Sequence, residues 1–139
     1  MSEKPKVLVI DDERDMISSL SVRLSSVGYD VLAATDGITG LGIATHAAPN
    51  VILLDVEMRG MGGLDVLAEL KRQNTTHDIP VIVLSASVDE QSRAGVAALG
   101  ASCFMEKPFQ SERLLAAIRH ALTETGPKPS GATSARRGA

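Results

Sequence analysis

The sequence predicts a doubly wound α/β fold, in which helices cover both faces of a parallel sheet. Two observations predict it: short apolar runs recur along the chain, and stretches with helical periodicity separate them. Nearly continuous apolar runs are typical of strands that are buried on both faces, as in a parallel sheet. Because strands and helices alternate, each connection is expected to be a crossover between parallel strands.

Five apolar runs are the expected strands. The clearest three end abruptly at a polar side chain, and they lie at 6–10, 51–54 and 81–84. Two weaker runs lie at 29–34 and 101–105. The regular spacing of the five runs predicts five βα units.

Helical patterns fill the stretches between the runs. Ile17, Leu20 and Leu24 recur three and four positions apart, and Gly28 provides a helix end. Similar patterns predict helices around 64–70, 88–99 and 114–122. A helix is also expected at about 37–47, but Gly40 and Gly42 each cost about 0.5–1 kcal/mol relative to alanine. We therefore expect this second helix to be short or mobile.

Length and composition bound the domain organisation and the functional class. The 139 residues fit one domain, which we place at 1–124, followed by a disordered tail or linker at 125–139 that is rich in Gly, Pro, Ser and Ala. The net charge of −3 and the three aromatic residues argue against direct nucleic-acid binding. A single cysteine, Cys103, excludes an intrachain disulfide, and no apolar run reaches the roughly 18 residues of a membrane span. We expect a cytoplasmic protein without membrane contact.

Polar side chains follow four of the five expected strands. Asp11 and Asp12 follow the first strand, Asp55 the third, Ser85 the fourth, and Lys107 lies just after the fifth. Ligand sites of open parallel sheets form outside the carboxyl ends of the strands, so these side chains are expected to meet. Each has a simpler interpretation by itself: the aspartates and Ser85 as helix-capping or turn residues, and Lys107 as a surface lysine.

Three neighbouring carboxylates repel one another unless a cation lies between them. Oxygen ligands without a His or Cys cluster favour Mg²⁺ over Zn²⁺. Mg²⁺ beside a lysine clamps phosphoryl oxygens, and an aspartate can form an acyl phosphate. Because the chain has no glycine-rich nucleotide loop of the Gly-x-x-x-x-Gly-Lys-Ser/Thr type, the pattern indicates a protein that accepts a phosphoryl group.

Five segments together resemble the receiver domain of two-component response regulators. They are VLVIDDE at 7–13, VILLDVEM at 51–58, GGLD at 62–65, IPVIVLSA at 79–86, and the stretch from Gly100 to KPF at 107–109. The resemblance covers about residues 5–124. It implies a flavodoxin-like fold with five helices and strand order 2-1-3-4-5.

The resemblance also implies a role for each site residue. Asp55 would accept a phosphoryl group from a histidine kinase or a phosphotransfer protein, and Ser85 and Lys107 would hold the phosphoryl oxygens. Asp12 would bind Mg²⁺ directly, Asp11 mainly through water, Asp55 as a further ligand, and Glu57 through its backbone carbonyl. Ser85 and Phe104 would be the switch residues, although Phe104 is equally well explained as a core side chain. The Lys107–Pro108 peptide bond would be cis.

The expected output is a change of surface. In the family, the fourth helix, fifth strand and fifth helix contact a downstream effector protein, and phosphorylation can drive homodimerisation. Such a protein is a signalling switch that only phosphorylates and dephosphorylates itself, and it is not an enzyme with a separate substrate.

Departures from the family pattern lie near the phosphoacceptor. Arg59 stands where the family often has proline, which leaves the loop freer. Glu57 and Ser87 occupy positions where family side chains tune the access of water to the acyl phosphate.

Two other functional classes stay open. One is a Mg²⁺-dependent aspartyl phosphatase, but that class has a second aspartate two residues after the nucleophile, where this chain has Glu57. The other is a receiver-like interaction module that no longer takes phosphate, and the presence of Asp12, Asp55, Ser85 and Lys107 argues against it.

Overall fold

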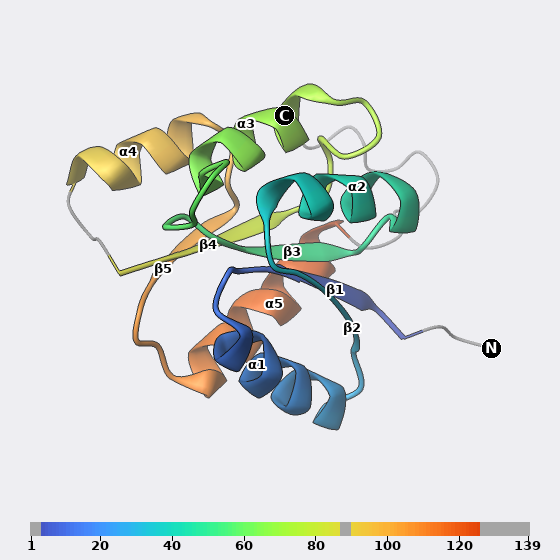
Figure 1. The fold of residues 1–139 in the computed structure, drawn as a ribbon. Coiled ribbons are helices and arrows are strands. Elements are labelled where there is room, and N and C mark those ends of the chain that lie inside the picture. The colour runs from blue at the N-terminus through green and yellow to red at the C-terminus, as the bar shows by residue number, and fades with distance from the viewer. Residues whose placement is uncertain (1–3, 87–89, 126–139) are drawn as a thin grey trace.

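Five parallel strands form the centre of the computed structural model, and helices cover both faces of the sheet (Figure 1). The structure describes residues 4–86 and 90–125. The strands are β1 (Lys6–Ile10), β2 (Asp30–Ala34), β3 (Val51–Asp55), β4 (Val81–Ser85) and β5 (Cys103–Glu106). The helices are α1 (Arg14–Ser26), α2 (Gly37–Ala47), α3 (Gly63–Arg72), α4 (Glu90–Ala98) and α5 (Ser111–Thr125). The strand order β2-β1-β3-β4-β5 confirms the predicted fold class.

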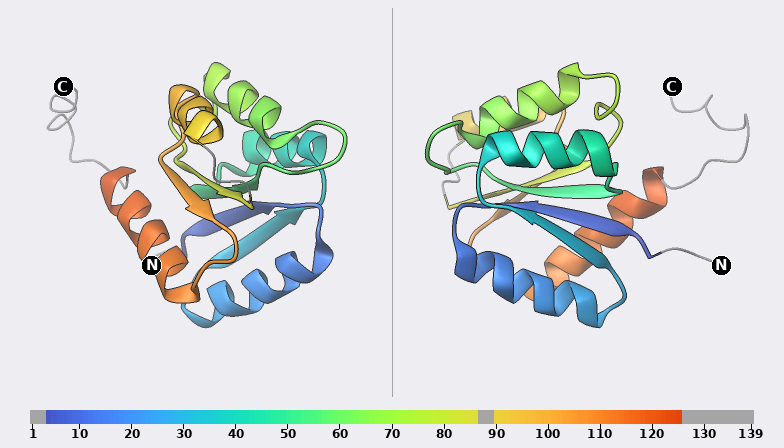
Figure 2. Two further views of the ribbon diagram at one scale, coloured as in Figure 1. Left: turned by 90° about the vertical axis from the view of Figure 1, so that its left-hand side faces the viewer. Right: turned by 45° about the vertical axis from the view of Figure 1, so that its right-hand side comes forward.

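The helices divide into two layers with a core on each face of the sheet. Figure 2 shows α1 and α5 on one face and α2, α3 and α4 on the other. Successive side chains of a strand point to opposite faces of the sheet. Val7 and Val9 of β1 therefore pack with Leu24 and Ile118, whereas Leu8 and Ile10 pack with α2, α3 and α4. All five residues of β3 and of β4 are buried, which explains why the first four of each strand are apolar.

The register of the sheet brings the carboxyl ends of four strands together. Ile10 pairs with Leu54, so the residue after β1 lies beside Asp55. Asp55 pairs with Leu84, and Ser85 in turn pairs with Glu106. Each polar residue therefore lies level with the last residue of a neighbouring strand or one residue from it. As a result Asp11, Asp55, Ser85 and Lys107 lie at the same edge of the sheet.

The second helix has the bounds that the sequence predicts, and its glycines do not shorten it. At 11 residues α2 is longer than α3 or α4, so of the two effects expected of its glycines, a short helix is not observed. Gly40 is required by packing, because a Cβ there would lie 2.6 Å from Cδ1 of the buried Ile10. Asp36 caps the helix by accepting a 2.8 Å hydrogen bond from the Thr39 N–H. Close packing and a cap therefore offset the low helix propensity of glycine. Its mobility stays a prediction.

One boundary differs from the predicted one, and two further predictions extend beyond the described residues. β5 begins at Cys103, because Gly100 adopts φ +97° and Ala101 N–H still bonds the carbonyl of Val96 at the end of α4. The predicted start of the fourth helix, at 88, lies outside the described residues. α5 ends at Thr125, and the residues after it, where we expect the tail or linker, also lie outside them.

Candidate functional site

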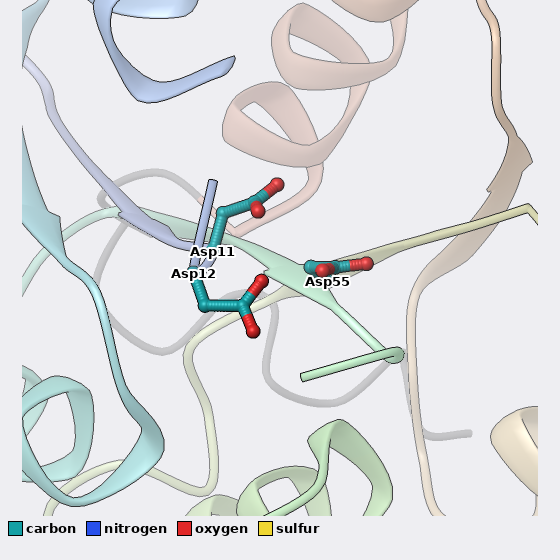
Figure 3. Close-up of side chains that lie close together, drawn as sticks. All are labelled: Asp11, Asp12 and Asp55. Atoms are coloured by element: carbon teal, nitrogen blue, oxygen red, sulfur yellow. The ribbon is translucent and has the colours of Figure 1, made fainter. Parts of the chain in front are cut away.

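Three carboxylates meet at the carboxyl edge of the sheet (Figure 3). Asp11 and Asp12 follow β1, and Asp55 is the last residue of β3. One oxygen from each carboxylate lies within 4.8 Å of the others. Asp11 and Asp55 are 1% and 2% exposed, so two of the three charges are removed from bulk water. The structure thus brings together the three aspartates that the sequence indicated.

Backbone hydrogen bonds fix two of these carboxylates. Asp11 Oδ1 accepts from the Glu13 N–H at 2.9 Å, and Asp12 Oδ2 accepts from the Arg59 N–H at 3.1 Å. The helix-capping interpretation of the aspartates is not supported, because the N-cap of α1 is Glu13 and its side chain makes no capping hydrogen bond. The bond from Arg59 ties the loop after β3 to the loop after β1.

A glycine allows the loop after β3 to fold closely over Asp55. A Cβ on Gly63 would lie 2.4 Å from Cα of Val56 and 2.5 Å from the carbonyl oxygen of Asp55. Since both are backbone atoms, no side-chain rotation could relieve the overlap. Gly63 therefore allows α3 to begin directly against the end of β3.

Lys107 supplies the positive charge of the site. Its Nζ lies 3.1 Å from Asp55 Oδ1 and 3.5 Å from Asp11 Oδ2, and its side chain is 15% exposed. The Lys107–Pro108 peptide bond is cis, as predicted. Burial lowers the pKa of the Lys107 ammonium, but the hydrogen bond to Asp55 and the charges of Asp11, Asp55 and Glu13 outweigh it, so its pKa is raised. Lys107 is an ammonium ion at neutral pH.

The pKa of Asp55 is raised, so the charged form of this carboxyl is disfavoured. Burial and the negative charge of Asp11 raise the pKa of Asp55 to about 6, although Lys107 and the Glu57 N–H act in the opposite sense. One lysine therefore does not compensate for crowded carboxylates, and an additional cation would stabilise the ionised form.

The residues fit a Mg²⁺ ion. Asp11 Oδ2 is buried and has no hydrogen-bond partner among the described residues, although the Lys107 ammonium lies 3.5 Å away. A buried carboxylate oxygen without a donor is costly unless a cation satisfies it. The available ligands are all oxygens, which Mg²⁺ prefers, and one side of the group opens to water, of which Mg²⁺ keeps several molecules.

Ser85 lies at the carboxyl edge of the sheet, but its hydroxyl is hydrogen-bonded to Glu57. Ser85 is 1% exposed and donates to Oε2 of Glu57. The Glu57 Oε1 accepts from the Ala86 N–H at 3.0 Å. The sequence placed Glu57 at a tuning position, but it did not reveal this contact, because the partners are 28 and 29 residues away. Ser87, the other expected tuning residue, lies outside the described residues.

Phe104 connects the edge to α4. It lies on β5, where it pairs with Val83, and is half-buried against the core that α2, α3 and α4 cover. The Cζ of Arg93 on α4 lies 5.1 Å from the centroid of its ring, within cation–π range. Phe104 is therefore partly a core residue and partly a surface contact, and nothing in the sequence indicated Arg93 as its partner.

The charged groups line an open cleft of about 450 Å³. Its walls come from the loops after β1, β3 and β4 and from Lys107. The lining residues are Asp12, Glu13, Asp55, Glu57, Arg59, Ala86 and Lys107. A cleft of this size that combines carboxylates, an ammonium and a backbone amide suits a small anionic group held beside a cation.

Comparison with known proteins identifies the family. The family model of the response regulator receiver domain matches residues 7–119. The chain belongs to the response regulator receiver family. It is a receiver domain of two-component signal transduction and thus a signalling protein.

Relatives and solved structures agree with this assignment. The receiver domain is 40% identical over 120 residues to a probable transcriptional regulator ycf27 of Porphyridium aerugineum, covering 86% of this chain and 49% of that protein. It is 36% identical over 128 residues to the DNA-binding dual master transcriptional regulator RpaA of Synechocystis, covering 92% and 53%. The chemotaxis protein CheY4 of Vibrio cholerae superposes with a TM-score of 0.82 at 30% identity, covering 86% of this chain and 100% of that structure.

The receiver domain spans about half the length of the curated relatives it matches. Within the described part of the chain, none of the helices has the length and apolar character needed to cross a membrane.

Proposed function

We propose that this receiver domain is switched by phosphorylation of Asp55. The observation that carries the proposal is the placement of a buried aspartate 3.1 Å from an ammonium ion and beside two further carboxylates, at the edge of an open cleft. The donor is a phosphohistidine of a histidine kinase or a phosphotransfer protein. The domain turns over no separate substrate, and its own chemistry is limited to gaining and losing one phosphoryl group.

Asp55 is the nucleophile. The hydrogen bonds that it accepts from Lys107 Nζ and from the Glu57 N–H both end on Oδ1, so we assign Oδ2 as the attacking oxygen. A bond forms between this oxygen and phosphorus as the bond between phosphorus and the histidine nitrogen breaks. The electron pair returns to the imidazole, which takes a proton from solvent.

Asp11, Asp12 and Asp55, with the backbone carbonyl of Glu57, would hold Mg²⁺. When bound, the ion neutralises carboxylate charge and the charge that develops on the phosphoryl oxygens. Lys107 exchanges its contact with Asp55 for a phosphoryl oxygen, and it stays an ammonium ion throughout because its pKa is raised.

The readout passes through Ser85 and Phe104 to the surface of α4, β5 and α5. When the hydroxyl of Ser85 turns toward the phosphoryl group, space opens beside β4, and Phe104 on the adjacent strand turns inward. This movement separates its ring from Arg93 and changes the surface of α4. The partner is an effector protein, or a second copy of the domain, rather than DNA, since this chain has a net charge of −3 and few aromatic residues.

The test is intact-mass spectrometry after incubation with acetyl phosphate. We expect one phosphoryl adduct that requires Mg²⁺ and is lost in Asp55→Asn. If the phosphoryl adduct hydrolyses too quickly to detect, the protein is treated with beryllofluoride, a stable analogue of the phosphoryl group. NMR spectra of the Phe104 and α4 amides are then the readout. If neither reagent acts on the wild type, a phosphate-independent interaction module is the better description.

A further inference from the structure

The Glu57 side chain spans from the loop after β3 to the end of β4. Its two carboxylate oxygens accept two donors on adjacent residues: Oε2 accepts from the Ser85 hydroxyl and Oε1 from the Ala86 N–H. Glu57 is exposed and lines the same cleft as Asp55 and Lys107. The carboxylate therefore lies beside the phosphoacceptor without being part of the buried aspartate group.

These two donors lie at the end of β4, beside the cleft in which a phosphoryl group on Asp55 would lie. Ser85 is the hydroxyl that we assign to a phosphoryl oxygen, and the Ala86 amide follows it into the cleft. A carboxylate and a phosphoryl group both present anionic oxygens, so both can accept charge-assisted hydrogen bonds from these donors.

We propose that Glu57 is an internal competitor of the phosphoryl group. In the unphosphorylated domain its carboxylate occupies the Ser85 hydroxyl and the Ala86 N–H, and it must leave before those donors can turn to a phosphoryl group on Asp55. This inference rests on the proposed function. Because Glu57 is exposed, its displaced carboxylate is hydrated by solvent, and the two arrangements form a bistable element.

The consequence is a latch that favours the inactive state. Shortening the side chain by one methylene, as in Glu57→Asp, keeps the negative charge but removes the reach to β4. If the latch operates, Glu57→Asp and Glu57→Ala both release the donors. Simple charge repulsion between Glu57 and an incoming anion predicts instead that only Glu57→Ala has an effect.

The experiment is a beryllofluoride titration of the full chain at saturating Mg²⁺, followed by the amide resonance of Ala86. We expect Glu57→Asp and Glu57→Ala to tighten beryllofluoride binding by about tenfold, the size expected for release of one charge-assisted hydrogen bond. In the absence of beryllofluoride, the Ala86 amide resonance should shift in both variants, because its hydrogen bond is lost. In a Ser85→Ala background the gain from Glu57→Asp should shrink, since one of the two latch donors is gone.

Glu13→Ala is the matched control. Glu13 is also an exposed glutamate of the cleft, and its side chain makes no capping hydrogen bond. Its removal should change the affinity by no more than about twofold, the size of a screened charge effect.

Three outcomes are decisive. If Glu57→Asp binds like the wild type while Glu57→Ala binds more tightly, charge repulsion replaces the latch. If both variants bind beryllofluoride more weakly, Glu57 supports the active site and the inference is wrong, although the proposed function stands. If the wild type and every Glu57 variant fail to bind, the proposed function fails, and the latch fails with it.

Discussion

Burial makes the charge of Asp55 unfavourable in the metal-free domain. Burial and Asp11 raise its pKa from 3.8 to about 6. Between these values the folded state holds a proton that the unfolded state has lost, so stability falls as pH rises through this range. Above about pH 6 the ionised carboxylate destabilises the fold. A shift of this size corresponds to roughly 3 kcal/mol, which the open cleft reduces to about 1–2 kcal/mol by solvent screening.

Replacing this carboxylate should therefore stabilise the domain. We expect Asp55→Asn to increase the free energy of unfolding in EDTA by about 1–2 kcal/mol at pH 7.5. The gain should shrink as the pH approaches 4, where the wild-type carboxyl is protonated in the native state and its charge no longer destabilises the fold. Urea unfolding followed by circular dichroism at several pH values measures both effects.

Asp30→Asn is the control for this prediction, because Asp30 is exposed at the start of β2. It should change stability by less than about 0.5 kcal/mol. A gain for Asp55→Asn that is equally large at pH 4 and pH 7.5 would show that its origin is not the ionised carboxylate.

The sequence predicted which charged residues meet at the site better than it predicted their contacts. Asp11, Asp12, Asp55 and Lys107 could be placed together because each follows a strand of a parallel sheet, and parallel strands end at one edge. The contacts of Glu57 could not be predicted, because a flexible, exposed side chain can choose among many donors. Its choice of Ser85 and Ala86 depends on the path of two loops.

At the scale of elements, α2 shows how packing decides the role of a glycine. Gly40 faces Ile10 of β1, whereas a Cβ on Gly42 would meet no atom within 4 Å. Both are interior positions of one helix, so their intrinsic helix propensities are the same. The difference between them measures packing alone.

Alanine at these two positions should have opposite effects. We expect Gly42→Ala to increase the free energy of unfolding by about 0.5–1 kcal/mol, because alanine favours the helix. Gly40→Ala should decrease it by about 1–3 kcal/mol, since the new Cβ overlaps a buried side chain. Thermal or urea unfolding of both variants checks the prediction. A stabilised Gly40→Ala would mean that Ile10 has room to move.

Element prediction from the sequence succeeded where burial is complete and failed where it is partial. The strands β3 and β4 are buried on both faces, so an unbroken apolar run identified each of them. β5 is only half-buried, and its start was placed two residues early. The bounds of α2 were predicted, but the reason that it tolerates Gly40 was not, because helix propensity does not include the close approach of a glycine to a neighbouring strand.

At the scale of the whole molecule, metal binding is coupled to the free energy of unfolding. The unfolded chain does not hold Asp11, Asp12 and Asp55 together, so a Mg²⁺ ion held by these residues would bind the native state preferentially. A ligand of this kind stabilises by about 2.7 kcal/mol when its concentration is a hundred times its dissociation constant.

Mg²⁺ should therefore reverse the order of stability of two proteins. In EDTA, Asp55→Asn is expected to be more stable than the wild type at pH 7.5. Added Mg²⁺ should stabilise the wild type progressively and the variant far less, because the variant lacks one anionic ligand. Thermal unfolding across a Mg²⁺ series, with Ca²⁺ as a parallel series for ion size, measures the effect. Equal stabilisation of both proteins would place the ion elsewhere.

The pairing of the strands also constrains how the chain acquires its structure. Lys6 pairs with Asp30 and Val7 with Val51, so neighbouring strands are joined by long crossovers and not by hairpins. Each pairing requires the closure of a loop of dozens of residues before it returns any stability, which slows folding relative to a helical bundle of the same size. Until β3 has been synthesised, β1 has one neighbour and an open apolar edge. During translation this edge is the segment at greatest risk of pairing with another chain.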